Sequence, residues 1–151
     1  MNHANIAQFA DDIAIYYSNK NFKCLVRRLQ EETQLVINYL KNWKLKTNPN
    51  KCEAILFTKK RKYLGTTLKI NDSHLKWQSK VKYLGVLLDR RANWAAHTTL
   101  IKEKARMAIK VIWPLIRPGS SLSLEGKLTL YKMLVKPILA YAVPAWLPYA
   151  S

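Results

Sequence analysis

Two adjacent carboxylates, Asp11 and Asp12, separate apolar runs at residues 5–9 and 13–17. Runs rich in Ile, Phe and Tyr on both sides of a polar pair predict two strands joined by a tight turn, with the acids at its tip. Successive side chains on a regular strand point to opposite faces, so only a turn lets both acids address one small volume. Like charges held this close repel one another, and a divalent cation relieves the repulsion. Ligation by a few oxygen atoms favours Mg²⁺; a solvated turn without function is the alternative.

The charge balance points to a polyanionic partner. The chain has 151 residues, of which 26 are Lys or Arg and 9 are Asp or Glu, so its formal net charge is +17. The basic residues are spread through several segments rather than gathered on one amphipathic helix, which favours nucleic acid over a membrane surface as the partner. A basic but merely soluble surface is the alternative. Apolar residues make up 49% of the chain, enough to bury a core.

The cysteines and the apolar segments do not indicate a secreted or membrane protein. Cys24 and Cys52 lie far apart and have no ligand spacing with any of the three histidines, so we interpret both as reduced packing residues. No basic segment followed by an apolar stretch marks a signal peptide. The most apolar region, residues 133–150, is interrupted by one lysine and three prolines, which argues against a membrane span. An intracellular location, in the nucleus or the cytoplasm, is expected.

Helical periodicity follows the predicted hairpin. Asn21 is a candidate N-cap for a helix that ends near Asn42. An Asn-Pro pair within residues 44–51 is a loop signal, and a strand is expected over residues 52–58. The basic run at residues 59–62 is either a solvated loop or a phosphate contact. The buried stripe of the helix is predicted to contain Phe22, Leu25, Val26, Leu29, Thr33, Val36, Ile37 and Leu40.

Further strands are expected before residue 90. Alternating apolar and polar residues at 67–70 and 75–78 predict a hairpin around a turn at residues 71–74. A strand is expected over residues 80–89, in which Gly85 indicates a bulge or the close approach of another backbone. The N-terminal part of the chain is therefore predicted to be a small α+β unit.

Two helices are predicted in the rest of the chain. The first begins near Trp94 and is closed by Pro114 and the sequence Pro118-Gly119-Ser120-Ser121. The second is capped by Ser123 and kinked near Pro137. The residues expected to face inward are Ile101, Ala105, Ala108, Ile112 and Leu115 on the first helix, and Leu124, Leu128, Tyr131, Val135 and Ile138 on the second.

The first of these helices also offers a basic side. Lys102, Arg106 and Lys110 lie largely off its apolar face, where they face solvent or a phosphate backbone. The aromatic residues near the end of the chain are expected to be core or domain contacts, with base stacking as the alternative: Tyr141, Trp146 and Tyr149.

The residues Phe9-Ala10-Asp11-Asp12 resemble the aromatic-Ala-Asp-Asp hairpin of reverse transcriptases, particularly those of jockey-like non-LTR retrotransposons. Three further blocks follow in the order of that family: WKLKTNPNKCE from residue 43, VKYLGVLLD from residue 81 and LYKMLVKPILAY from residue 130. The resemblance implies that residues 1–90 are the C-terminal part of a polymerase palm and that residues 91–151 are a thumb-like helical region. It also implies RNA-directed DNA polymerase activity, an RNA template and a DNA primer.

The resemblance assigns a role to each matching position. Asp11 and Asp12 become catalytic ligands for two Mg²⁺ ions, which align and stabilise nucleotidyl transfer. Lys51 falls near the incoming nucleotide, where it would neutralise or protonate the departing phosphate, or serve only as a loop cation. The remaining roles are the nucleotide pocket at Phe9 and Ala10, the primer grip at Tyr83, Leu84 and Gly85, and duplex contact by Lys102, Arg106 and Lys110.

The resemblance is incomplete upstream. Members of the family carry a third metal-binding Asp and a nucleotide-selecting segment well before this hairpin, and neither is present in the sequence. Asp72 and Asp89 have structural interpretations of their own and are not taken as replacements. We therefore expect a C-terminal polymerase fragment that needs the missing fingers and upstream palm as its partner and is inactive alone. A nucleic-acid-binding module that uses only its basic residues, or a degenerate remnant without function, are the alternatives.

Overall fold

The computed structural model describes residues 4–60 and 67–147. The chain divides into two compact units, Met1–Leu84 and Gly85–Ser151, so the division falls before the expected boundary near residue 90. The first unit contains most of the strands and one long helix, and the second is mainly helical, which agrees with the predicted α+β class. In the described parts of the chain, no helix combines the length and the apolar character needed to cross a membrane.

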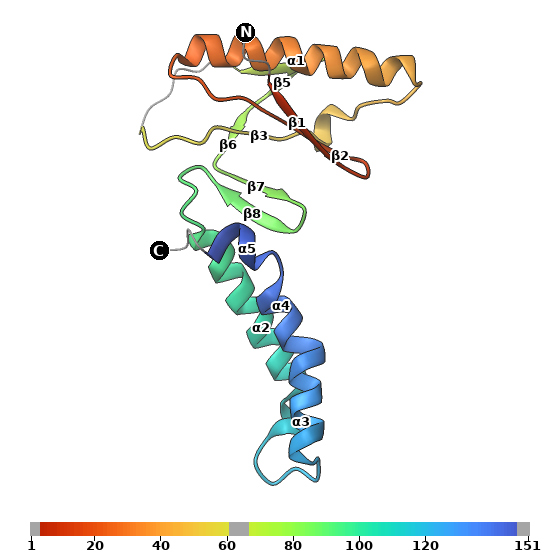
Figure 1. The fold of residues 1–151 in the computed structure, drawn as a ribbon, viewed down its shortest axis with the longest axis vertical. Coiled ribbons are helices and arrows are strands. Elements are labelled where there is room, and N and C mark those ends of the chain that lie inside the picture. Colours follow the sequence, from red (N-terminus) through yellow and green to blue (C-terminus); the bar gives the residue numbers. More distant parts are fainter. Residues whose placement is uncertain (1–3, 61–66, 148–151) are drawn as a thin grey trace. The chain divides into compact units, whose positions relative to one another are not determined.

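Helix α1 (Phe22–Asn42) begins and ends as the sequence predicted. The Asn21 side chain caps it by accepting a hydrogen bond from the Cys24 amide (3.2 Å). Val26 packs with two buried residues from strands, Ala54 and Leu68, in the core of the first unit. Every member of the predicted stripe is buried or half-buried, so the periodicity correctly identified the face that packs on the strands. Figure 1 shows α1 above the strands of this unit.

The strands of the first unit form short pairs. Strand β1 (Asn5–Phe9) pairs antiparallel with β2 (Asp12–Tyr16), and β4 (Leu68–Ile70) pairs antiparallel with β5 (Ser73–Leu75). Strand β3 (Ala54–Ile55) pairs in parallel with β6 (Trp77–Gln78).

These pairings correct two predicted elements. The strand expected over residues 52–58 is reduced to the two residues of β3, and the turn expected over residues 71–74 is only Asn71-Asp72. Asn71 has a φ of +51°, which lets the chain reverse within two residues. Of the basic run at residues 59–62, Lys59 and Lys60 are exposed and the other two lie outside the described residues.

The second unit is built around helix α2 (Ala95–Ile116). Its core joins Ala105 and Ile112 of α2 to Val135 of the following helical segment. Figure 1 shows α2 running alongside α3 and α4. The helix continues through Pro114, so that residue does not close it, but it ends at Ile116, just before the closing sequence predicted from Pro118. The following elements are α3 (Leu124–Leu130), capped as predicted by Ser123, a π-helical turn (Tyr131–Val135), α4 (Lys136–Ala140) and α5 (Val143–Trp146).

Several residues expected to face inward are exposed. Leu124 is 74% exposed and Leu128 is 48% exposed, whereas Val135 is 2% exposed. A π-helical turn holds more residues than an α-helical turn, so the face defined by Val135 is not the face defined by the residues before the turn. A single α-helical register could not place both sets in the core. The other residues wrongly expected inside are Leu115 and Tyr131.

Candidate functional site

The hairpin of β1 and β2 carries the two carboxylates at its tip. Phe9 pairs with Asp12 at the last rung, which leaves Ala10 and Asp11 as the two turn residues. Ala10 has a φ of +53°, and its carbonyl accepts a hydrogen bond from the Gln8 side-chain amide (3.2 Å). Asp11 therefore lies in the turn and Asp12 opens β2, close to the arrangement that the sequence predicted.

Both carboxylates are exposed. Among the described residues, no group of three or more His, Cys, Asp or Glu side chains could hold a metal ion together. Two carboxylates nevertheless fit the way in which Mg²⁺ is usually bound, because this ion takes one or two protein oxygens and completes its shell with water and substrate phosphates. The residues that could hold such an ion are Asp11 and Asp12.

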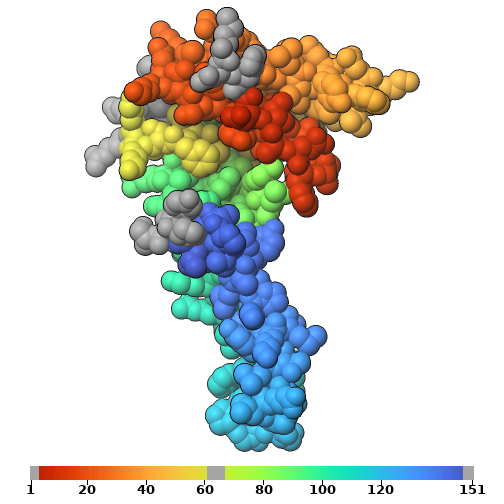
Figure 2. All heavy atoms as spheres, in the orientation of Figure 1, coloured from red at the N-terminus to blue at the C-terminus, as the bar shows by residue number. Residues whose placement is uncertain are grey.

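Several apolar side chains along the hairpin are exposed. Phe9 is 65% exposed and Ile6 is 52% exposed, and Tyr16 at the other end of β2 is 56% exposed. Figure 2 shows the hairpin, in dark red, on the surface of the first unit. The residues assigned to a nucleotide pocket, Phe9 and Ala10, are thus placed beside the carboxylates and open to solvent.

Lys51 is placed on a different element from the carboxylates. It ends a 3₁₀ turn (Pro49–Lys51), whose Asn48 cap accepts a hydrogen bond from the Asn50 amide (3.0 Å). The Lys51 side chain is exposed. The next residue, Cys52, is a free thiol whose pKa is raised by burial, as expected for a packing residue rather than a nucleophile.

The primer-grip candidates form a turn rather than part of one long strand. Strand β7 (Lys80–Tyr83) is followed by β8 (Val86–Asp89), with Leu84 and Gly85 between them. Their φ values are +45° and +77°. Two consecutive positive φ values reverse the chain, as in the tight turns of β-hairpins, so the strand predicted over residues 80–89 was wrong and Gly85 is not a bulge.

Gly85 is approached closely by a side chain, that of Tyr141, and not by the backbone that the sequence suggested. A Cβ atom at this position would lie 3.0 Å from Cε1 and 3.2 Å from the hydroxyl oxygen of Tyr141. Trp146, which is 7% exposed, donates an indole hydrogen bond to the Tyr141 carbonyl (3.0 Å). Tyr141 is half exposed and Trp146 is a core residue, and the third terminal aromatic, Tyr149, lies outside the described residues.

Asp89 organises the start of α2, a role that the sequence did not reveal. Its buried carboxylate accepts hydrogen bonds from the backbone amides of Arg91 (2.9 Å), Asn93 (3.4 Å) and Trp94 (2.9 Å). Trp94 has a φ of +62° and offers no side-chain cap of its own, so Asp89 takes over that function from outside the helix.

His97 is tied to the β8 strand in the same unit. It is 1% exposed, and its Nδ1 accepts a hydrogen bond from the Leu87 amide (3.2 Å). Its ring meets that of Trp146 edge to face, with centroids 5.4 Å apart. Burial, and secondarily the charge of Lys104, lowers the pKa of His97. The sequence showed no ligand spacing between the cysteines and the histidines, and it did not reveal that this histidine anchors a strand.

The predicted basic side of α2 is present. Lys102, Arg106 and Lys110 are all exposed, and their spacing of four residues places them on one face of the helix. The structure thus assigns Phe9, Ala10 and the two carboxylates to one hairpin, and the three cations to a helix of the other unit.

Comparisons with known proteins agree with the motif. Residues 1–88 match the model of the family described as reverse transcriptase (RNA-dependent DNA polymerase). The chain is 34% identical over 143 residues to the RNA-directed DNA polymerase from mobile element jockey of Drosophila funebris. It is 30% identical over 141 residues to a probable RNA-directed DNA polymerase from transposon X-element of Drosophila melanogaster. Each alignment covers 93% of this chain and 15% of the relative.

A comparison with solved structures finds no match. The family model covers more than half of the chain, including the hairpin of β1 and β2 that carries the two carboxylates. The alignments with the relatives cover nearly the whole chain. The resemblance to jockey-like polymerases of non-LTR retrotransposons is therefore confirmed, and the chain belongs to the reverse transcriptase family.

Proposed function

We propose that the chain is the C-terminal part of the RNA-directed DNA polymerase of a jockey-like non-LTR retrotransposon. In this assignment residues 1–90 complete the palm and residues 91–151 form a thumb-like region. The observation that carries it is the match to the reverse transcriptase family over residues 1–88, which includes the hairpin that presents Asp11 and Asp12. An RNA template and a DNA primer are the proposed substrates.

The hairpin carboxylates are the proposed ligands for two Mg²⁺ ions. When bound, such ions neutralise charge on the reacting phosphate oxygens. The chain's own contribution is to hold Asp11 in the turn and Asp12 on the first rung of β2, so that both oxygen donors project from one element. Phe9 and Ala10 would border the incoming nucleotide, and Lys51 would place a positive charge near its phosphates.

The metal site can be tested without polymerase activity. Mn²⁺, a paramagnetic substitute for Mg²⁺, is expected to broaden the backbone amide NMR signals of the hairpin tip. The double variant Asp11→Asn and Asp12→Asn should abolish the broadening. Asp72→Asn is the matched control, because Asp72 is an exposed acid in the turn of another hairpin. Equal broadening in the double variant and in the wild type would contradict the assignment.

DNA synthesis is proposed to need the rest of the polymerase, because the chain spans about 15% of the length of the relatives. We expect no primer extension on an RNA template by the 151-residue chain with Mg²⁺. Addition of the preceding palm and fingers as a separate polypeptide should restore it. Robust synthesis by the chain alone would overturn the proposed inactivity. The intracellular location, nuclear or cytoplasmic, stays a prediction.

A second function, nucleic-acid binding without catalysis, is favoured by the basic face of α2. Its exposed Lys102, Arg106 and Lys110 would contact the phosphates of an RNA–DNA hybrid, with Tyr83, Leu84 and Gly85 near the primer. Hybrid binding that weakens with salt and survives Asp11→Ala and Asp12→Ala would support this function. Binding that needs both carboxylates and Mg²⁺ would favour the polymerase role instead.

A further inference from the structure

The turn between β7 and β8 is contacted by an aromatic residue from near the end of the chain. Tyr141 lies between α4 and α5, and its ring packs where a Cβ atom of Gly85 would stand, 3.0 Å from Cε1 and 3.2 Å from the hydroxyl oxygen. Glycine leaves room for this ring because it has no side chain. Tyr141 stays half exposed, so the contact does little to bury it.

Three further contacts hold Tyr141 in place. Trp146 of α5 donates an indole hydrogen bond to the Tyr141 carbonyl (3.0 Å), and its ring meets that of His97 edge to face, with centroids 5.4 Å apart. His97 accepts a hydrogen bond from the Leu87 amide (3.2 Å). Leu87 follows Gly85 by two residues in β8, so the contacts form a closed loop that begins and ends at the turn. Figure 1 shows α5 beside the start of α2, where His97 lies.

Backbone strain gathers around this loop of contacts. Leu84, directly before Gly85, has a φ of +45°. In the part of the second unit that the structure describes, the non-glycine residues with a positive φ all lie just before α2 or α5: Ala92 (+51°), Trp94 (+62°) and Ala142 (+51°). Such strain persists only where surrounding contacts determine the conformation, and it is common at functional sites. The conformation of the turn is therefore held from outside by the residues packed on it.

We propose that Tyr141 is a positioning residue for the primer in DNA synthesis. Its ring would hold the backbone at Leu84 and Gly85, the primer-grip candidates, in one conformation, so that the primer end is always presented in the same geometry. A displacement of about 1 Å in such a position can slow a reaction by about 100-fold. Tyr141 acts through the turn and not by touching the substrate. The inference rests on the proposed function and adds a residue that has no assigned part in it.

The test is the burst phase of primer extension on an RNA template, by the full chain together with the preceding palm and fingers. With primer–template in excess, the burst amplitude measures the fraction of folded enzyme, and the burst rate constant measures how well the primer is positioned. Tyr141→Ala removes the ring and should lower the rate constant by about 10- to 100-fold. Tyr141→Phe keeps a ring against Gly85 and should stay close to the wild-type rate constant.

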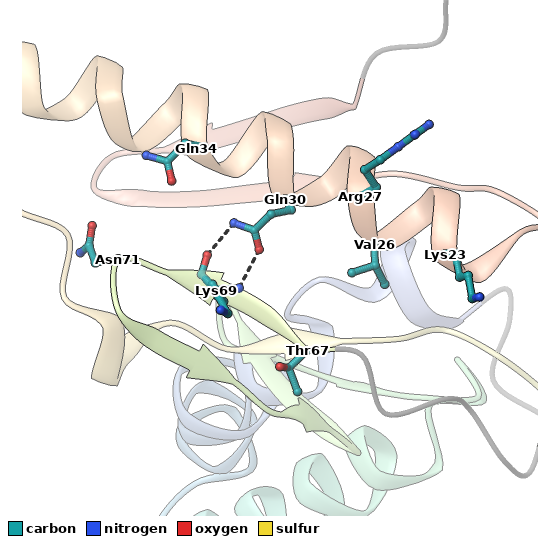
Figure 3. A pocket seen from close by; sticks show the side chains of 8 residues that line it. All are labelled: Lys23, Val26, Arg27, Gln30, Gln34, Thr67, Lys69 and Asn71. Atoms are coloured by element: carbon teal, nitrogen blue, oxygen red, sulfur yellow. Dashed lines mark hydrogen bonds between the residues drawn. The ribbon is translucent and has the colours of Figure 1, made fainter.

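Two control variants weaken the fold without changing the contacts of Tyr141. Val135→Ala removes methyl groups from the core of the second unit. Gln30→Ala acts in the first unit, where the Gln30 amide donates to the Lys69 carbonyl (2.8 Å) and its oxygen accepts from the Lys69 amide (2.7 Å). Figure 3 shows both bonds as dashed lines between α1 and β4. Each control should lower the burst amplitude at most and leave the rate constant unchanged.

A double variant tests whether Tyr141 acts through the turn. Gly85→Ala and Tyr141→Ala change the same contact, so the double variant should be no slower than the slower single variant. Two effects that multiply would mean that Tyr141 touches the substrate directly, and would overturn the positioning role.

The remaining outcomes also decide the inference. If Tyr141→Ala lowers only the amplitude, as the controls do, Tyr141 is a packing residue and the inference is overturned. If Tyr141→Phe is as slow as Tyr141→Ala, the hydroxyl rather than the ring is needed, which overturns positioning by the ring. If the wild type with its added palm and fingers extends no primer, the proposed function itself fails, and the positioning role fails with it.

Discussion

The turn at Gly85 allows a quantitative test of how β8 and the end of the chain fit together. Gly85 has a φ of +77° and faces Tyr141, whereas Gly119 has a φ of +80° and a Cβ atom added there would have nothing within 4 Å. Both glycines belong to the second unit. Replacing each by alanine therefore imposes the same backbone strain, but only Gly85→Ala adds a steric conflict.

The expected magnitudes follow from these geometries. A left-handed conformation costs an L-residue about 1–2 kcal/mol, which is the whole expected effect of Gly119→Ala. At Gly85 the new methyl would lie 3.0 Å from Tyr141 Cε1, inside the optimal carbon separation of about 3.5–4.0 Å. Overpacking of this kind costs roughly 1–3 kcal/mol more. Gly85→Ala should therefore lower the free energy of unfolding by about 2–5 kcal/mol.

Urea unfolding, followed by tryptophan fluorescence, measures both variants. The single variant Tyr141→Ala and the double variant Gly85→Ala with Tyr141→Ala complete a cycle that separates strain from steric conflict, because without the ring Gly85→Ala should cost only the backbone term. If Gly85→Ala is no more destabilising than Gly119→Ala, or if Tyr141→Ala recovers nothing, the packing of Tyr141 against the turn is refuted.

Three further changes test the second unit. Val135→Ala should lower the free energy of unfolding by about 2–3 kcal/mol through the lost methyl groups and the cavity, whereas Val111→Ala, at a 77% exposed position, should change it little in the same urea titration. Asp89→Ala should cost about 2–3 kcal/mol and reduce helicity measured by circular dichroism, because three backbone amides lose a charged acceptor. Burial, and then the charge of Lys104, lowers the pKa of His97 below 6.5. The unfolded state therefore binds the proton more readily than the folded state does. The contribution of His97 to the free energy of unfolding is thus complete above about pH 6.5 and declines as the pH falls below that value. Unfolding titrations across about pH 5–8 should show this decline in the wild type and lose it in His97→Gln.

Features that depend on neighbouring residues were predictable from the sequence. The caps at Asn21 and Ser123 and the buried stripe of α1 follow from local hydrogen bonding and helical spacing. The hairpin that presents Asp11 and Asp12 follows from two apolar runs around a polar turn. The residue types and their order were therefore enough to locate the candidate site in the chain.

Features that depend on distant residues were not predictable. The parallel pairing of β3 with β6 joins residues 54–55 to residues 77–78, and no local pattern specifies that these two strands pair with each other. The buried hydrogen bond from Leu87 to His97 arises only when β8 packs on α2. The exposed Leu128 reflects the π-helical turn, which hydrophobic periodicity assumes to be absent.

Because of that π-helical turn, the orientation of α3 relative to α4 depends on the number of residues between them. The segment from α3 through Tyr131–Val135 to α4 is helical throughout, with one wide turn in the middle. Deletion of a single residue there would restore α-helical spacing and rotate α3 by about 100° relative to α4. Val135 would keep its place against α2, while the surface that α3 offers to other molecules would be exchanged for a different one. A one-codon deletion at this point would thus change which side chains α3 turns toward α2 and which it exposes, while Val135 stays in the core.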